Sequence, residues 1–237
     1  MKVPAKFKYN GVIDLLCDAV FQCRLAAGTK DSYTMNRHAR ASILSSILAL
    51  ESAANALLLS LEFSEKFADD LDKLSVLSKF EMYLLRLGGE THPLDRGVVE
   101  VQRVQELLSA RNEYVHSKVK SIPTDVSPFE DRGDMVALPL ELTGERWKAV
   151  GIPKRPMFWS ADSARSVLAS TVAFLKMVVH DHAKLSPDSA RYLLHSRLEI
   201  GEAHAVATFD EFLKELTDTT DVGVSFEFLG FPERSAE

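Results

Sequence analysis

The chain has 237 residues, of which 46% are hydrophobic and 26% are charged. These shares are typical of a folded globular protein and exclude the disordered, collagen-like and coiled-coil classes. The net charge is −6, from 28 basic and 34 acidic residues, which excludes a protein that binds nucleic acid through its overall charge. Any contact with a polyanion must therefore come from a local basic patch.

The first half of the chain is predicted to be helical. Apolar residues recur there every three or four positions, which is the spacing that places them on one face of a helix. The expected helices span residues 11–27, 33–62 with Ser32 as the N-cap, 64–71, 75–87 and 97–119.

One stretch of the second helix, residues 41–61, is long and apolar enough to cross a bilayer. Glu51 and Asn55 lie at its centre. Because a carboxylate at mid-membrane is costly, we interpret this stretch as the central buried helix of a protein that does not enter a membrane.

The second half is predicted to combine helices with short extended segments. Residues 121–159 contain several prolines and glycines and an alternating stretch at 135–142, which favours a small β-hairpin or sheet. The alternating tail, residues 222–228, is expected to pair with that stretch as a strand. The expected helices of this half cover residues 164–183 after a start signal at Ser160 to Ser163, residues from Pro187 onward after the N-cap Ser186, and residues 204–216.

These patterns divide the chain into three parts. Residues 1–30 form an N-terminal helix, residues 31–185 a helical bundle with a β-rich insertion at about 121–159, and residues 186–237 C-terminal helices and an acidic tail. The last part has eleven acidic and four basic residues, whereas residues 30–120 are nearly balanced in charge. A polyanion site is therefore expected in the earlier part.

The two cysteines, Cys17 and Cys23, are interpreted as buried reduced thiols. They lie six residues apart in one predicted helix, so their side chains diverge, and a chain of this length needs no disulfide to hold its core. No signal-peptide cleavage site is apparent near the N-terminus. We therefore expect a cytoplasmic protein.

Most sequence motifs of enzymes are absent. The chain has no glycine-rich phosphate loop, no nucleophile elbow, no His-Glu-x-x-His and no Cys-x-x-Cys. Glu113 and His116 match the Glu-x-x-His of di-iron bundles, but such sites use two of these motifs and two further glutamates. We therefore expect no metal.

Two other histidine groups are interpreted as structural. His180 and His182 are two residues apart near a predicted helix end, where cations interact favourably with the helix dipole. His195 and Glu199 are four residues apart and are expected to form a surface pair.

The end of the helix predicted at 97–119 is different. At about 100° per residue, Arg111 falls within an apolar stripe formed by Val104, Leu108, Val115 and Val119. Asn112 and His116 share one flank of that stripe, whereas Arg111 and His116 are about 140° apart around the helix. The two side chains are therefore expected to meet only across a two-fold interface between two copies of the helix.

The segment Arg111-Asn112-Glu113-Tyr114-Val115-His116 resembles the Arg-x4-6-His motif of HEPN domains. These are up-and-down helical bundles found in prokaryotic toxins, defence proteins and RNA-processing factors. The polar Asn112 after the arginine is typical of active members, and the long helix around Glu51 is similar to the core of that fold. The resemblance covers about residues 31–185 and implies a mainly α, HEPN-like bundle.

The resemblance further implies a homodimeric, metal-independent endoribonuclease without a cofactor. A ribose 2′-OH attacks the adjacent phosphate and leaves a 2′,3′-cyclic end, with His116 as general acid or base and Arg111 neutralising charge on the phosphate. Asn112 would orient either group. Some toxins of the family carry a tyrosine two residues after the histidine, where this chain has Lys118.

Two basic clusters are expected to flank a groove for single-stranded RNA. Arg37, His38 and Arg40 precede the central helix, and Lys118 and Lys120 follow the motif.

An alternative function is a non-catalytic module that binds RNA, nucleotides or a protein, as many HEPN members do, in the role of an accessory to a defence or toxin-antitoxin system. In that case Arg111 forms a buried ion pair with Glu51 that fixes the register of two helices, and Asn55 completes the network. An antitoxin or accessory protein would be the partner.

Overall fold

The computed structural model describes residues 4–88, 94–116, 118–119, 145–201, 203–206 and 209–231. This part of the chain is mainly helical, as predicted, with eight α-helices and a three-stranded antiparallel sheet. The helices are α1 (Val12–Gly28), α2 (Ser32–Leu59), α3 (Glu65–Asp72), α4 (Val76–Gly88), α5 (Val99–Val115), α6 (Ala161–Lys176), α7 (Pro187–Leu194) and α8 (Asp210–Thr217). The strands are β1 (Lys6–Lys8), β2 (Arg197–Ile200) and β3 (Ala203–Val206), in the order β1-β2-β3.

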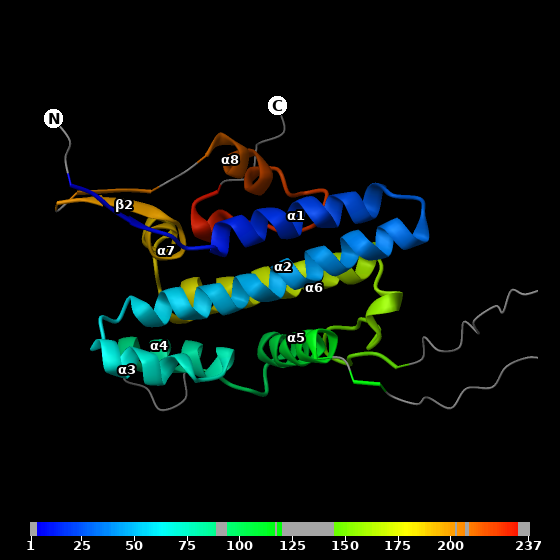
Figure 1. Cartoon of the computed structure of the whole chain (residues 1–237), viewed down its shortest axis with the longest axis horizontal. Helices are drawn as coiled ribbons and strands as arrows, with labels where there is room; N and C mark the ends of the chain where they lie inside the picture. The colour runs from blue at the N-terminus through cyan, green and yellow to red at the C-terminus, as the bar shows by residue number, and fades with distance from the viewer. Residues whose placement is uncertain are drawn as a thin grey trace, which may run out of the picture.

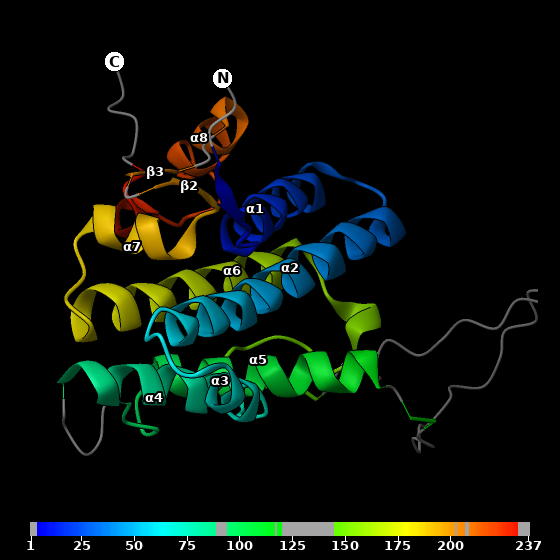
Figure 2. The same cartoon turned by 60° about the vertical axis from the view of Figure 1, so that its left-hand side comes forward.

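The helices form a bundle in three layers (Figure 1). The middle layer holds α2 and α6; α1, α7, α8 and the sheet lie on one side of it, and α3, α4 and α5 on the other (Figure 2). Among the long helices, α1 and α5 run in one direction and α2 and α6 in the other, which is an up-and-down arrangement. One core of buried apolar residues extends through all three layers.

Helix α2 is the central element because its residues allow close packing on several sides. Small side chains on it are buried, including Ser42 and Ala53. Ser42 donates a hydrogen bond to the Ala19 carbonyl of α1 at 2.8 Å, so this hydroxyl links the two helices. The helix begins one residue earlier than predicted: Asp31, not Ser32, is the N-cap, and its carboxylate accepts from the Thr34 amide at 2.7 Å.

Within the described residues, α2 is also the one helix that has the length and hydropathy to span a membrane. In its most apolar 18-residue window, 56% of the residues are buried inside the fold. A core helix is expected to show this burial, because its apolar faces are covered by α1, α4 and α6.

Helix α6 begins with the predicted cap and ends irregularly. Ser160 and Ser163 form a reciprocal capping box. The helix predicted at 164–183 is regular only up to Lys176, and residues Met177–His182 continue it as a π-helix. Helix α7 begins as predicted, with Ser186 as the N-cap and Pro187 in the first turn.

The C-terminal part differs most from prediction. The helix expected at 204–216 is wrong in its first half, because residues 203–206 form strand β3, paired with β2, and α8 begins only at Asp210. The tail at 222–228 is not a strand. Its alternate residues Val222, Val224, Phe226 and Phe228 are buried as the pattern predicts, but the segment consists of a turn followed by a short 3₁₀ helix, Glu227–Leu229. Its expected partner, residues 135–142, lies outside the described residues.

Candidate functional site at the end of α5

The register of α5 decides which of its side chains face the core. Its buried residues are Val101, Val104, Leu107 and Ala110. The helix ends at Val115 with His116 as the C-cap, not at Val119 as predicted, and Val115 is 56% exposed. The second half of the predicted apolar stripe is therefore wrong. The buried residues recur every three positions, and this spacing moves the buried face of the helix away from Val115.

Arg111 lies beside this buried face and forms an ion pair with Glu51 of α2. Its Nη2 lies 2.5 Å from Oε1 and 2.6 Å from Oε2 of Glu51, so one nitrogen serves both carboxylate oxygens. The Arg111 and Glu51 side chains remain 25% and 23% exposed. Nη1 of Arg111 donates to Oδ1 of Asn112 at 2.8 Å. The guanidinium is thus held within one protomer by a carboxylate from the neighbouring helix.

Asn55 does not belong to this ion pair. Its Oδ1 accepts from Nζ of Lys79 on α4 at 2.7 Å, and the same ammonium contacts Asp72 at 2.6 Å. The side chain of Lys79 is 7% exposed, and the hydrogen bond from its ammonium lowers the pKa of the Asp72 carboxyl. Asn55 therefore serves a second polar cluster, which joins α2 to α4 and to the end of α3.

His116 lies on the other side of the helix end. Its side chain is exposed and has no hydrogen bond to any described residue. Asn112, Glu113, His116 and Lys118 line an open hollow of about 410 Å³. The structure thus brings Asn112, His116 and Lys118 to one surface, while Arg111 is directed away from it toward Glu51.

The start of α2 and the end of α5 contact the same short segment of the chain, which includes the 3₁₀ helix Pro156–Phe158. Asn36 of α2 donates to the carbonyls of Pro156 and Trp159, both at 2.9 Å. The Tyr114 ring of α5 lies 5.8 Å from the Trp159 ring, measured between centroids. Both elements lie at one end of the bundle (Figure 2).

The basic residues near this end have different surroundings. Arg37 is exposed, with its guanidinium 5.9 Å from the centroid of the Tyr33 ring. Arg40 is half-buried, and its Nε is a buried donor without a hydrogen-bond partner in the described part of the chain. Lys118 is exposed, and Lys120 lies outside the described residues.

His195 is buried, and not at the surface as the sequence predicts. The side chain is 1% exposed, its Nδ1 lies 3.1 Å from the Ser196 carbonyl, and its buried Nε2 has no hydrogen-bond partner among the residues described. The predicted surface pair with Glu199 is wrong, because Glu199 contacts Lys8 of β1 at 2.7 Å instead. Burial lowers the pKa of the His195 imidazole. In the sequence, the burial of His195 is indicated only by its position directly after Leu194, an apolar residue at the end of the helix.

The cysteines and metal-ligating side chains add no further site. Cys17 and Cys23 are buried free thiols, as predicted, and burial raises the pKa of Cys17 to about 12. No group of three or more His, Cys, Asp or Glu side chains within the described ranges is arranged to hold a metal ion.

Comparison with known proteins leaves the family open: no protein-family model, no curated protein and no solved structure matches the chain.

Proposed function

We propose that the chain is a HEPN-like, metal-independent endoribonuclease that acts on RNA as a homodimer. The observation that carries this proposal is the end of α5. There, the imidazole of His116, which has no partner among the described residues, shares an open hollow with Asn112 and Lys118, and Glu51 holds the guanidinium of the adjacent Arg111.

The residue types suit cleavage of a phosphodiester. One imidazole takes the proton of the ribose 2′-OH as its oxygen attacks the adjacent phosphorus, the bond from phosphorus to the 5′ oxygen breaks, and that oxygen takes up a proton. The products are a 2′,3′-cyclic phosphate and a 5′-OH. His116 is the side chain for these proton transfers, because its imidazole is accessible.

Arg111 is the cation for the charge that develops on the phosphate. Its Nη2 is occupied by Glu51 and one N–H of Nη1 by Asn112. Among the described residues, no other group takes the second Nη1 hydrogen or Nε, so both can donate to an oxyanion. Glu51 positions the guanidinium and does not touch the substrate.

The proposal requires two protomers. Arg111 and His116 leave α5 in different directions, so one protomer does not bring both to a single phosphate. A two-fold contact between the Asn112 and His116 flanks of two α5 helices would place each Arg111 near the partner helix. Light scattering should therefore give the mass of a dimer at micromolar concentration, and a strict monomer would remove this mechanism.

The Glu51–Arg111 pair favours a second candidate function. A guanidinium that already holds a carboxylate presents less net positive charge to a phosphate. In this case the chain is a non-catalytic module for RNA or a protein partner, such as an antitoxin or another accessory protein of a defence system, and Arg111 serves the fold.

Cleavage of an unstructured RNA in EDTA separates the two functions. An endoribonuclease produces fragments with cyclic phosphate ends in EDTA, and His116→Ala lowers the rate by about 100-fold or more. His182→Ala is the matched control, because His182 is also exposed and lies at the end of the π-helix. Equal cleavage by the wild type and His116→Ala, or complete loss in EDTA, would contradict the proposed mechanism.

A further inference from the structure

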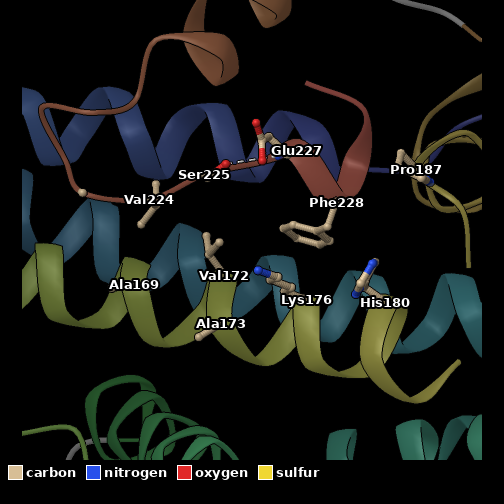
Figure 3. A pocket seen from close by; sticks show the side chains of 11 residues that line it. Ala169, Val172, Ala173, Lys176, His180, Pro187, Val224, Ser225, Glu227 and Phe228 are labelled. Atoms are coloured by element: carbon tan, nitrogen blue, oxygen red, sulfur yellow. Dashed lines mark hydrogen bonds between the residues drawn. The ribbon is translucent and has the colours of Figure 1, made fainter. Parts of the chain in front are cut away.

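A second hollow lies on the other side of α6 from α5, between α6 and the C-terminal segment (Figure 3). Its volume is about 530 Å³, within the range of pockets that hold small organic ligands. Val172, Val224 and Phe228 give it an apolar lining, and each of these side chains is less than a tenth exposed. The hollow is thus separate from the site at the end of α5.

The wall formed by the C-terminal segment is well fixed. Oγ1 of the buried Thr219 donates to the Val224 carbonyl at 2.7 Å, and Nε of Arg24 on α1 donates to Asp221 at 2.9 Å. Gly223 adopts a φ of +75°, a conformation that side chains disfavour, which lets the turn close. The pocket is therefore formed before any ligand arrives.

Polar groups line the opening of this pocket. Lys176 and His180, four residues apart, extend from α6 and its π-helical continuation toward the C-terminal segment, with the Phe228 ring between the two walls (Figure 3). The ammonium of Lys176 is exposed and has no ion pair with any described residue. Oγ of Ser225 accepts from the Glu227 amide at 3.4 Å, which leaves the hydroxyl hydrogen available as a donor.

His180 lies at the same opening and is held by its neighbour Asp181. Its Nδ1 lies 2.8 Å from a carboxylate oxygen of Asp181. Because a carboxylate only accepts, Nδ1 carries the hydrogen of this bond.

We propose that this pocket binds a small organic monocarboxylate with a flat apolar body. The body lies on Phe228 between the two walls, and the carboxylate accepts from Nζ of Lys176 and from the Ser225 hydroxyl. Glu227 on the opposite wall disfavours a ligand of higher negative charge. The ammonium of Lys176, which has no ion pair with a described residue, disfavours a cation.

The test compares two probes of the same shape, 2-naphthoate and the uncharged 2-naphthamide, by titration calorimetry on the full chain. We expect naphthoate to bind about tenfold or more tightly than the amide, since a charge-assisted hydrogen bond is lost in the amide. Lys176→Met should abolish this preference. Lys66→Met should retain it, because Lys66 is an exposed lysine on α3, outside this pocket.

Ala173→Phe tests the location independently of charge. Ala173 lines the pocket on α6, and a phenyl group there fills the space that the apolar body needs. Both probes should then lose affinity. No binding of naphthoate at millimolar concentration, equal affinity for the two probes, a preference that survives Lys176→Met, or unchanged binding in Ala173→Phe would each overturn the proposal. Because the test measures ligand binding alone, its result does not depend on ribonuclease activity.

Discussion

The substitution Arg111→Ala measures what the pair with Glu51 contributes to the fold. It removes the guanidinium and leaves the Glu51 carboxylate on α2 without its cation. Removing one partner of a fully buried pair costs about 3–5 kcal/mol, whereas an exposed pair contributes about 0–1 kcal/mol. Because about a quarter of each side chain is exposed, water can partly rehydrate the carboxylate, and we expect a loss of about 2 kcal/mol.

Urea unfolding and thermal melts of the wild type and Arg111→Ala provide the measurement. For a chain of this size, a loss of about 2 kcal/mol lowers Tm by about 4–8 °C. The double variant Glu51→Gln with Arg111→Met should recover most of the loss, because no charge is then stranded. A melting temperature within 1 °C of wild type in Arg111→Ala would refute the argument that this pair fastens α5 to α2.

The same variant also bears on function. If Arg111 contacts phosphate, Arg111→Ala abolishes RNA cleavage, and the stability-restored double variant remains inactive. If the guanidinium serves the fold alone, the double variant recovers both stability and whatever RNA or partner binding the wild type shows.

Four further outcomes are expected. The free energy of unfolding should fall between pH 7.5 and 5.5, because the pKa of buried His195 is lowered and the imidazole therefore binds a proton more readily in the unfolded chain than in the folded one below about pH 6.5. Urea unfolding should show a smaller fall in His195→Leu, and an identical fall would contradict this explanation. Lys79→Ala should cost about 1–3 kcal/mol by leaving Asn55 without its donor, measured by urea unfolding against Lys73→Ala, whose ammonium is exposed. Gly223→Ala should cost about 1 kcal/mol, because a Cβ there meets no atom within 4 Å and only the backbone conformation opposes it. Arg37→Gln and Lys118→Gln should each reduce the salt dependence of RNA binding by about one unit of logarithmic slope, and an unchanged slope would exclude a phosphate contact at that residue.

The helical pattern was largely predictable, because burial on one face of a helix imposes its period directly on the sequence. The residues at which helices begin and end were less predictable. Ser32 and Asp31 both suit an N-cap, and the hydrogen bond to Thr34 that selects Asp31 depends on the backbone geometry. The tail at 222–228 shows a similar difference. Its alternating pattern predicts correctly which side chains are buried, but it does not determine whether the backbone pairs with another strand.

The ion pair between Glu51 and Arg111 was anticipated as one alternative because a charged side chain near an apolar face needs a partner. The prediction that Asn55 completes this pair was wrong, because the packing of α4 brings Lys79 to Asn55, a contact that no pattern in the sequence indicates. The pocket beside α6 was not predictable either, because it is formed by residues about 50 positions apart and by a π-helix that no simple period indicates.

Helix α6 contacts both candidate sites. One side of this helix packs against α5, whose end carries Arg111 and His116, and the other side forms a wall of the pocket at Lys176. The regular helix ends at Lys176, and the π-helix that follows needs a different hydrogen-bond pattern from the rest of α6. A ligand held by Lys176 and Ser225 would therefore bind beside the junction of two helical geometries, on an element that also supports α5. Such a ligand would change the proposed RNA cleavage only if it bound one conformation of this junction more tightly than another, since a ligand that binds all conformations equally shifts none.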